Sequence, residues 1–396
     1  MMTMTEPVAV APPAPDADRL HRPDPQDIPF FAAISDYPCV SIVLATRPGA
    51  RMEPVDRAHL EALIAVAHRR LQEEGLADAD TVAEALRDRA QVVSAGPTDQ
   101  GLVIYARRGM VEHRHLPIAV ADRVVVDPTF ATRDLVRAVQ ANPDYLLLVL
   151  DADSAHLYGS RVGALAAIED DQFPIRRTTE NERKDTGARP GRRRGSRPGR
   201  TDQRQREQTR TFLRRVDSLL ATRLARKPQP VIVMAGDRIL SDFLSVTQMS
   251  DRIIGLARGS GSRLGLRRLE RAVRPLLSDH IADLEAAAHD TLEARMPGRE
   301  VVTGLPACWH AALSERPELL LVEQSYAMPA RLSTDGSLLA LTGPDERELP
   351  EVIDDAVDEL IELVISKRGQ VRFVPDGSLP HDDRIALSVV LPRRRR

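Results

Sequence analysis

Two apolar stretches decide the fold: residues 145–157, which read YLLLVLDADSAHL, and residues 231–236, which read VIVMAG. The run YLLLVL is far too short to span a bilayer and has the length of a fully buried strand. Asp153 and Ser154 form a good turn, so the residues that follow should return as a hairpin partner. Between the two stretches, apolar residues at helical spacing predict a long amphipathic helix from about residue 201: Phe212, Leu213, Val216, Leu219, Leu220 and Leu224. Strands that alternate with helices indicate an α/β domain, which we expect to span residues 142–297.

Toward the N-terminus, a second α/β domain is predicted over residues 36–141. Residues 1–35 are rich in Pro, Ala and Asp and predict a disordered tail, with order beginning near Pro38. Apolar patterns then predict alternating elements, namely strands at 39–44, 101–106, 111–116 and 124–126, and helices at 55–75, 81–92 and 131–141.

Toward the C-terminus, residues 298–396 predict a third α/β domain. A polar loop is expected at 333–348, followed by a helix over about 350–368 with Gly369 as its C-cap. One face of this helix is an apolar stripe made of Ile353, Val357, Leu360, Ile361 and Val364. The opposite face is acidic and carries Glu351, Asp354, Asp355, Asp358, Glu359 and Glu362. An acidic face repels phosphate, so we expect it to bind a protein partner.

Composition excludes several classes of protein. With 42% hydrophobic and 29% charged residues, the chain has an ordinary globular profile. Cys39 and Cys308 are far apart and form no C-x-x-C, which excludes a disulfide scaffold or a cysteine-based zinc site. No signal peptide or membrane span is evident, so we expect a cytoplasmic protein.

The charge is concentrated in one segment. Residues 176–226 contain 17 basic and 6 acidic residues, a net charge of +11, which leaves −14 for the rest of a chain whose total is −3. Residues 176–200 contain almost no large apolar side chain and cannot join a core. Such an arm is typical of polyanion binding through phosphates rather than through bases. The alternative is a solvated loop in a chain that uses Arg almost exclusively as its basic residue.

The order of elements resembles that of the archaeo-eukaryotic class I release factors and Pelota. The stretches YLLLVLDADSAHL and VIVMAGDR resemble the middle domain of that family. ELLLVEQSY, VIDDAVDELIELVISKRG, QVRFVPDGSLP and IALSVVLP resemble its C-terminal domain. More specifically, residues 36–393 resemble the bacterial archaeo-eukaryotic release factor family, family 3. The resemblance implies three successive α/β domains, the middle one RNase H-like and the last similar to kink-turn-binding ribosomal proteins. It also implies the ribosome, rRNA or tRNA as partners.

In the release factors, a Gly-Gly-Gln tripeptide in the middle-domain loop positions a water against the peptidyl-tRNA ester. This sequence contains no Gly-Gly-Gln. The nearest approximation is Gly199-Arg200-Thr201-Asp202-Gln203, so the resemblance makes Gln203 the candidate catalytic residue, with Gln205 and Gln208 as rivals. The candidate RNA-binding residues are Arg189, Arg192, Arg193, Arg194, Arg197, Arg200 and Arg204. Because Pelota-type members lack the tripeptide and do not hydrolyse the ester, both a peptidyl-tRNA hydrolase and a non-hydrolytic factor stay open.

Other constellations favour structural roles. Residues 259–265 contain Gly but match no phosphate-loop or dinucleotide motif, which favours a connection between strand and helix. His113 and His115 share one face of a strand without a third ligand, which favours exposed histidines over a metal site. Asp151 and Asp153 are expected in a turn, and Asp382-Asp383 likewise. We therefore expect no metal and no cofactor.

The sequence thus predicts a translation-associated factor that binds the ribosome or peptidyl-tRNA through an Arg-rich loop. The alternative function is a non-catalytic protein-interaction module whose basic loop stays disordered.

Overall fold

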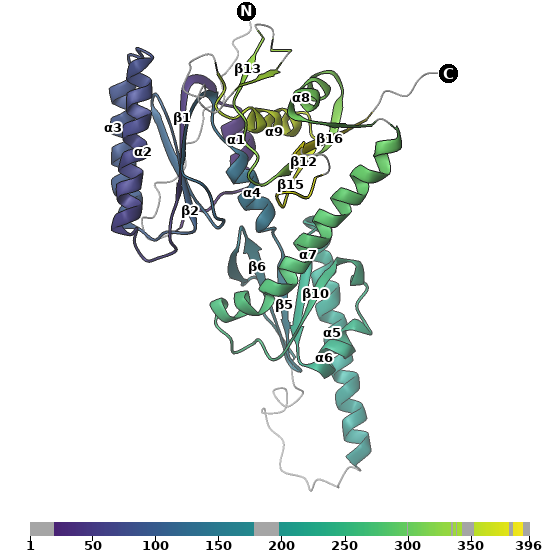
Figure 1. The fold of residues 1–396 in the computed structure, drawn as a ribbon. Coiled ribbons are helices and arrows are strands. Elements are labelled where there is room, and N and C mark those ends of the chain that lie inside the picture. Colours follow the sequence, from purple (N-terminus) through teal and green to yellow (C-terminus); the bar gives the residue numbers. More distant parts are fainter. Residues whose placement is uncertain are drawn as a thin grey trace, which may run out of the picture. The chain divides into compact units, whose positions relative to one another are not determined.

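The computed structural model describes residues 20–177, 198–298, 300–333, 336–337, 339–342, 352–379 and 383–390. For residues 198–204 and Leu339 it describes the backbone alone. The chain divides into two compact units (Figure 1). Unit 1 consists of Met1–Gln140 and Leu292–Arg396, and unit 2 consists of Ala141–Thr291.

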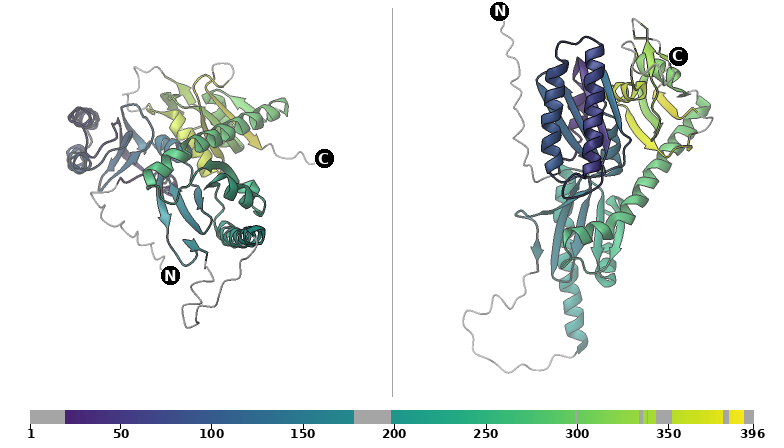
Figure 2. Two further views of the ribbon diagram at one scale, coloured as in Figure 1. Left: turned by 90° about the horizontal axis from the view of Figure 1, so that it is seen from below. Right: turned by 60° about the vertical axis from the view of Figure 1, so that its left-hand side comes forward.

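The N-terminal part of unit 1 is an antiparallel sheet with the strand order β3-β2-β1-β4. Its elements are α1 (Asp27–Ala32), β1 (Ser35–Ala45), α2 (Pro54–Glu73), α3 (Ala79–Ala95), β2 (Gly101–Arg107), β3 (Met110–Leu116), β4 (Arg123–Thr129) and α4 (Arg133–Ala141). Successive residues of a strand point to opposite faces. Ile42 of β1 therefore joins the core beneath α2 and α3, which lie side by side in Figure 2, whereas Val43 joins the core that contains α1 and α4.

Order begins earlier than the sequence predicted. The described chain starts at Leu20, and α1 lies within the segment expected to be a tail. Phe31 of α1 is fully buried, with its ring centroid 4.4 Å from that of Tyr105 and 5.9 Å from that of Phe130. This aromatic contact stabilises a six-residue helix that polar flanking sequence does not reveal. Residues 1–19 lie outside the described part of the chain.

The C-terminal part of unit 1 is a mixed sheet with the strand order β11-β16-β12-β15. Strand β12 runs parallel to β15 and antiparallel to β16. The elements are η2 (Met296–Gly298), β11 (Val301–Thr303), α8 (Leu305–Ser314), β12 (Arg316–Glu323), β13 (Ala330–Leu332), β14 (Leu339–Leu341), α9 (Ala356–Ser366), β15 (Gln370–Val374) and β16 (Ile385–Val390). Strand β14, which pairs with β13, lies within the region predicted to be a polar loop.

Helix α9 is shorter than the predicted helix over 350–368. It begins after Asp355, whose carboxylate accepts a hydrogen bond from Val357 N at 3.2 Å and so caps the helix. At its C-terminal end Arg368, not Gly369, adopts the left-handed conformation, with φ of 64°. Gly369 is required for another reason, because a Cβ at this position would lie 2.6 Å from Val364 Cγ1.

The two parts of unit 1 share one hydrophobic core. A single cluster contains Phe31, Tyr105 and Leu135 from the N-terminal part and Leu320 and Leu360 from the C-terminal part. Segments more than two hundred residues apart in the sequence thus fold against each other. The domain boundaries at 36, 142 and 298 stay a prediction.

Unit 2 is a mixed sheet with the strand order β10-β9-β5-β6-β7, and β8 pairs with β6. Its elements are β5 (Leu146–Leu150), β6 (Ser154–Arg161), β7 (Ala164–Ile168), β8 (Ile175–Arg176), α5 (Pro198–Arg226), β9 (Val231–Ala235), α6 (Asp237–Leu244), η1 (Ser250–Arg252), β10 (Ile253–Arg258) and most of α7 (Leu266–Arg295). The central strand β5 is antiparallel to β6 and parallel to β9. The stretch YLLLVLDADSAHL is therefore the predicted strand and hairpin.

The structure confirms the predicted α/β class. Helices and strands are mixed along the chain, although they occur in runs such as α2-α3, β2-β3-β4 and β5-β6-β7-β8 rather than in strict alternation. The RNase H-like character of the middle part and the kink-turn-protein likeness of the last part stay predictions. In the part of the chain that the structure describes, no helix is both long and apolar enough to cross a bilayer.

Candidate nucleic-acid interface

The basic segment is anchored to unit 2 on both sides. Strand β8 pairs with β6, and the next residue, Arg177, donates its backbone N–H to Asp153 O at 2.7 Å. The Arg177 guanidinium then donates to Thr209 Oγ1 of α5 at 3.2 Å. The chain therefore leaves the sheet next to α5, which is also the helix in which the basic segment ends.

Only the C-terminal part of helix α5 is embedded in the core of unit 2. Phe212, Leu213 and Val216 pack into the core of unit 2, together with Leu220 and Leu224. Thr209 is the first described residue of the helix that is buried, and residues 205–208 are all exposed. At 1.5 Å per residue, the helix from Pro198 to Gln208 extends about 16 Å. Figure 1 shows this end of α5 extending past the sheet of unit 2.

A row of arginines runs along the exposed side of α5. Arg206, Arg210 and Arg214 are spaced four residues apart, so they lie above one another on the helix surface, and all three are exposed. The Arg214 guanidinium lies 3.9 Å from a carboxylate oxygen of Glu207, whereas Arg206 and Arg210 form no ion pair with any described residue. We call these three residues the α5 arginine row. Guanidinium groups without carboxylate partners are available to phosphates.

The predicted site residues lie mostly outside the described part of the chain. Arg189, Arg192, Arg193, Arg194 and Arg197 belong to the segment 178–197 that the structure does not describe. Arg200, Gln203 and Arg204 lie on the backbone of α5, but their side chains are not described. The predicted roles of all eight residues therefore stay predictions. The rivals Gln205 and Gln208 are exposed on α5.

A second group of arginines was missed at the sequence level. Arg263 precedes α7, and Arg267, Arg268, Arg271 and Arg274 lie in its N-terminal half, all of them exposed. Residues 252–274 contain seven Arg and a single Glu, which is a detectable signal. The net charge of −14 over the chain outside 176–226 masks this local excess of Arg.

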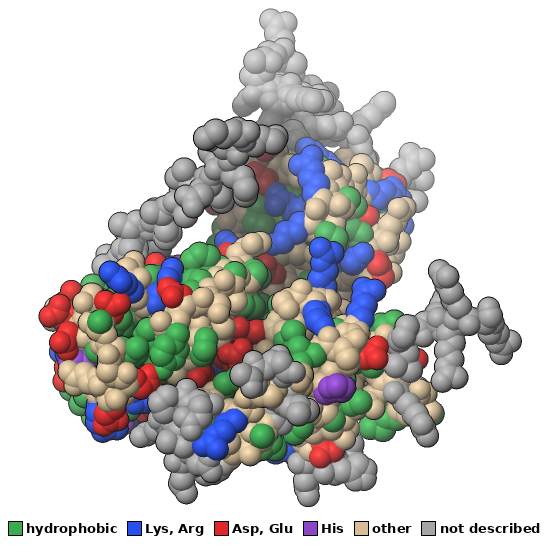
Figure 3. Space-filling model, turned by 90° about the horizontal axis from the view of Figure 1, so that it is seen from above, with side chains coloured by type: hydrophobic (Ala, Val, Ile, Leu, Met, Phe, Trp, Pro, Cys, Tyr) green, Lys and Arg blue, Asp and Glu red, His purple; other side chains and the backbone are tan. Residues whose placement is uncertain are grey.

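Unit 1 presents a different charge pattern. The turn between α2 and α3 carries exposed carboxylates, among them Glu73 and Asp80, whose side chains are 64% and 79% exposed. Figure 3 shows acidic side chains gathered at the left of the molecule, where α2 and α3 lie. Both carboxylates have basic neighbours, since Glu73 pairs with Arg69 and Asp80 with His68.

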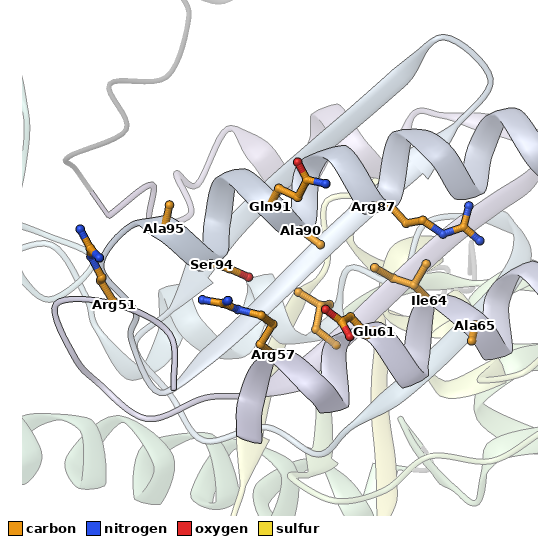
Figure 4. Close-up of a pocket in the computed structure, with 11 residues that line it drawn as sticks. Arg51, Arg57, Glu61, Ile64, Ala65, Arg87, Ala90, Gln91, Ser94 and Ala95 are labelled. Carbon is orange, nitrogen blue, oxygen red and sulfur yellow. The ribbon is translucent and has the colours of Figure 1, made fainter. Parts of the chain in front are cut away.

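A cavity of about 700 Å³ lies between α2 and α3. Buried apolar side chains such as Leu60 and Ile64 line it, together with exposed polar ones such as Arg57 and Gln91 (Figure 4). The side chains of Arg51, Arg57 and Arg87 are spread along the cavity rather than directed at one point. This arrangement lacks the convergent polar groups of a small-molecule site.

The histidine prediction was wrong in one respect. His113 and His115 are buried, at 5% and 4% exposure, not exposed, because the segment that contains His21 covers them. His115 N donates to His21 O at 2.8 Å, and the His21 ring contacts that of His113. Burial, together with the charge of His115, lowers the pKa of His113 to about 3. Among the described residues, no group of three or more His, Cys, Asp or Glu could hold a metal ion.

Two further predictions concern turns. Residues 259–265 connect β10 to α7, as predicted. Asp151 and Asp153 lie in the turn between β5 and β6, where Asp151 N donates to Ser154 O at 2.8 Å. Asp382 lies outside the described residues.

The acidic face of α9 is not a surface for a partner protein. Asp354, Asp355 and Asp358 are buried, and their carboxylates face the N-terminal part of unit 1. The Arg70 guanidinium donates to Asp354 at 2.8 Å, and that of Arg133 donates to Asp355 at 2.9 Å.

Two other carboxylates of the predicted acidic face support this correction. Glu362 accepts a hydrogen bond from the Thr132 hydroxyl at 2.8 Å, and Glu359 accepts one from the Thr129 hydroxyl. Glu351 lies outside the described residues. The prediction of a protein partner at this face is therefore corrected: the partner is the N-terminal part of the same chain.

Comparison with known proteins agrees with the predicted family. Residues 144–316 match the sequence model of "Bacterial archaeo-eukaryotic release factor family 3". No curated protein matches the chain.

Among solved structures, an archaeal translation termination factor is 15% identical, with 92% of this chain and 96% of that chain covered and a TM-score of 0.24. Pelota from Archaeoglobus fulgidus is 16% identical (74% and 80% covered, TM-score 0.33), and Dom34 from S. cerevisiae is 11% identical (72% of each chain covered, TM-score 0.38). Similarity at this level concerns the fold alone.

Residues 144–316, which include α5 and its arginine row, are thus similar to the bacterial archaeo-eukaryotic release factor family 3.

Proposed function

We propose that this protein is a cytoplasmic translation factor that binds the ribosome, with the α5 arginine row and the arginines before it contacting rRNA or tRNA phosphates. The observation that carries the proposal is the row itself. Arg206 and Arg210 lack ion-pair partners among the described residues, and they lie on a helix whose end extends past its sheet. This helix lies in the part of the chain that is similar to a release-factor family.

The proposed contacts recognise the shape and charge of the RNA. Each arginine that neutralises a phosphate releases condensed counterions, so binding should weaken steeply as salt is added. The segment offers few aromatic side chains for base stacking, which favours contacts to the backbone over sequence readout.

Ribosome co-sedimentation of the full-length protein at several salt concentrations tests this proposal. Replacement of Arg206, Arg210 and Arg214 by Gln should weaken binding and lower the slope of log K against log salt by about 2 to 3. Replacement of Arg57, Arg69 and Arg87, which are exposed on α2 and α3, is the matched control and should leave the slope unchanged. An unchanged slope in the α5 variant would exclude the row from the interface.

Hydrolysis of peptidyl-tRNA is the second candidate activity. Gln203 favours it, because this residue follows Gly199 closely and lies in the part of α5 that precedes its embedded residues. A water-positioning amide acts mainly by orientation, so Gln203→Ala should lower turnover far more than ribosome binding. Peptidyl-tRNA hydrolysis on purified ribosome complexes decides between the candidates. Wild-type activity that survives the substitution would reject Gln203, and binding without any activity would favour a non-hydrolytic, Pelota-like factor.

A further inference from the structure

The N-terminal half of α7 carries arginines that the proposed function does not use. We infer that unit 2 has two independent polyanion-binding surfaces on opposite faces of its sheet, and that it bridges two separate RNA segments. The inference rests on the proposed function in taking RNA as the ligand, and it adds a second surface and a bridging role.

The two surfaces lie on opposite faces because of the alternation in β5. Leu146 and Leu148 point into the core that contains Phe212 and Val216 of α5. Leu147 and Val149 point into the other core, which contains Leu269 and Val273 of α7. Helices α5 and α7 therefore cover opposite faces of the same sheet.

The α7 surface consists of Arg267, Arg268, Arg271 and Arg274, with Arg263 just before the helix. Leu269 and Val273 face the sheet, and the arginines are exposed. None of these five arginines forms an ion pair with a described residue. The single carboxylate among them, on Glu270, accepts a hydrogen bond from Leu165 N at 3.1 Å and is thus directed at β7. We call these five residues the α7 arginine surface.

The arginines at the N-terminal end of α7 do not stabilise this helix. The N-terminal end of a helix carries partial positive charge and favours acidic residues. The first turn of α7 contains no acidic residue and instead contains Arg267 and Arg268. Arg267 and Arg271, four residues apart, also repel each other. Charges that oppose local stability are typical of a functional surface, and a phosphate ligand would relieve the repulsion.

The two surfaces are far enough apart to act independently. Helices are about 10 to 12 Å wide, so the axes of two helices on opposite faces of a sheet are about 20 Å apart. This distance exceeds the Debye length of about 8 Å at physiological ionic strength. Neutralising one surface should therefore leave the affinity of the other unchanged, and losses at the two surfaces should add.

The test uses full-length protein and three variants. The first replaces the α5 arginine row with Gln, the second replaces Arg267, Arg271 and Arg274 with Gln, and the third combines both. The control is again Arg57, Arg69 and Arg87 replaced by Gln. Every changed side chain is exposed, so thermal unfolding should match wild type and exclude a folding defect.

Two measurements decide the inference. The first is binding to a short blunt-ended RNA duplex, of which wild type and control should bind two copies. Each single variant should bind one copy, with only the affinity and salt slope of its remaining surface, and the combined variant should lose both. The second is bridging, in which one immobilised duplex captures a second, fluorescent duplex through monomeric protein. Wild type and control should bridge, and each single variant should lose bridging while it still binds one duplex.

The outcomes separate this inference from the proposed function. An α7 variant with wild-type salt slope and bridging would overturn the second surface. A combined variant that binds RNA as strongly as the α5 variant would also overturn the second surface. Bridging of duplexes without ribosome binding would keep the two surfaces and reject the translation role. Ribosome binding that is weakened in the α5 variant but unchanged in the α7 variant, without bridging of duplexes, would keep the translation role and reject the second surface.

Discussion

At the residue scale, buried polar contacts join the two parts of unit 1 beside their shared hydrophobic core. Arg133 Nη1 donates to Asp355, and Arg133 N donates to Asp358 at 2.8 Å. Burial and the neighbouring Asp355 raise the pKa of Asp358 well above its ordinary value. Burial, with Asp358 and Glu359 nearby, raises the pKa of Glu362 to about 10. The Glu362 carboxyl group, at the junction of the two parts of unit 1, is thus protonated near neutral pH.

These carboxyl groups make stability depend on pH. The pKa of Glu362 is higher in the folded than in the unfolded state, so the folded state binds more protons and loses stability as the pH rises from about 4.5 toward 10. Glu362→Gln keeps the shape without the charge and should stabilise the protein at pH 8 by several kcal/mol, at about 1.4 kcal/mol for each pH unit above the ordinary carboxyl pKa.

Denaturant unfolding at pH 5 and pH 8 checks the Glu362 prediction. The stabilisation should be much smaller at pH 5, and the exposed Glu84→Gln control should show neither effect. Equal effects of Glu362→Gln at both pH values would mean that Glu362 is ionised in the folded protein.

At the element scale, sequence periodicity predicted the strands and the long helices but not what covers each helix face. The apolar stripe of α9 and the embedded side of α5 were read correctly from their spacing. The acidic face of α9 was misassigned, because its partners Arg70 and Arg133 lie more than two hundred residues away and spacing carries no information on them. Helix α1 was missed because it is held by tertiary aromatic contacts rather than by its own pattern.

The pairing of α4 with α9 gives a prediction at this scale. Arg133→Met would leave Asp355 buried without its counterion and should destabilise the protein by about 3 kcal/mol. Arg69→Met, which removes an exposed pair with Glu73, should cost no more than about 0.5 kcal/mol. Chemical denaturation of both variants provides the comparison, and equal losses would show that the α4–α9 pair contributes no more than a surface contact.

At the scale of the whole molecule, the two units differ in charge. This difference distinguishes them more clearly than the domain boundaries predicted from the sequence. Unit 2 carries both arginine surfaces, whereas unit 1 presents exposed carboxylates at the turn between α2 and α3. The shared core of unit 1 could not be predicted, since contacts between distant segments leave no local pattern in one sequence. The candidate site was only partly predictable. Its location before and along α5 follows from composition, but the α7 surface requires the fold.

The central claim is that α5 lies against ribosomal RNA, and tethered hydroxyl-radical probing tests it most directly. Both native cysteines are buried, and burial raises the pKa of Cys39 to about 11 and that of Cys308 to about 12, so a probe would react at an introduced cysteine. A probe at Thr211→Cys, exposed on α5, should cleave rRNA in the bound complex, whereas one at Ala62→Cys, exposed on α2, should not. Cleavage from Ala62→Cys alone, or from neither position in a ribosome-bound protein, would contradict the claim.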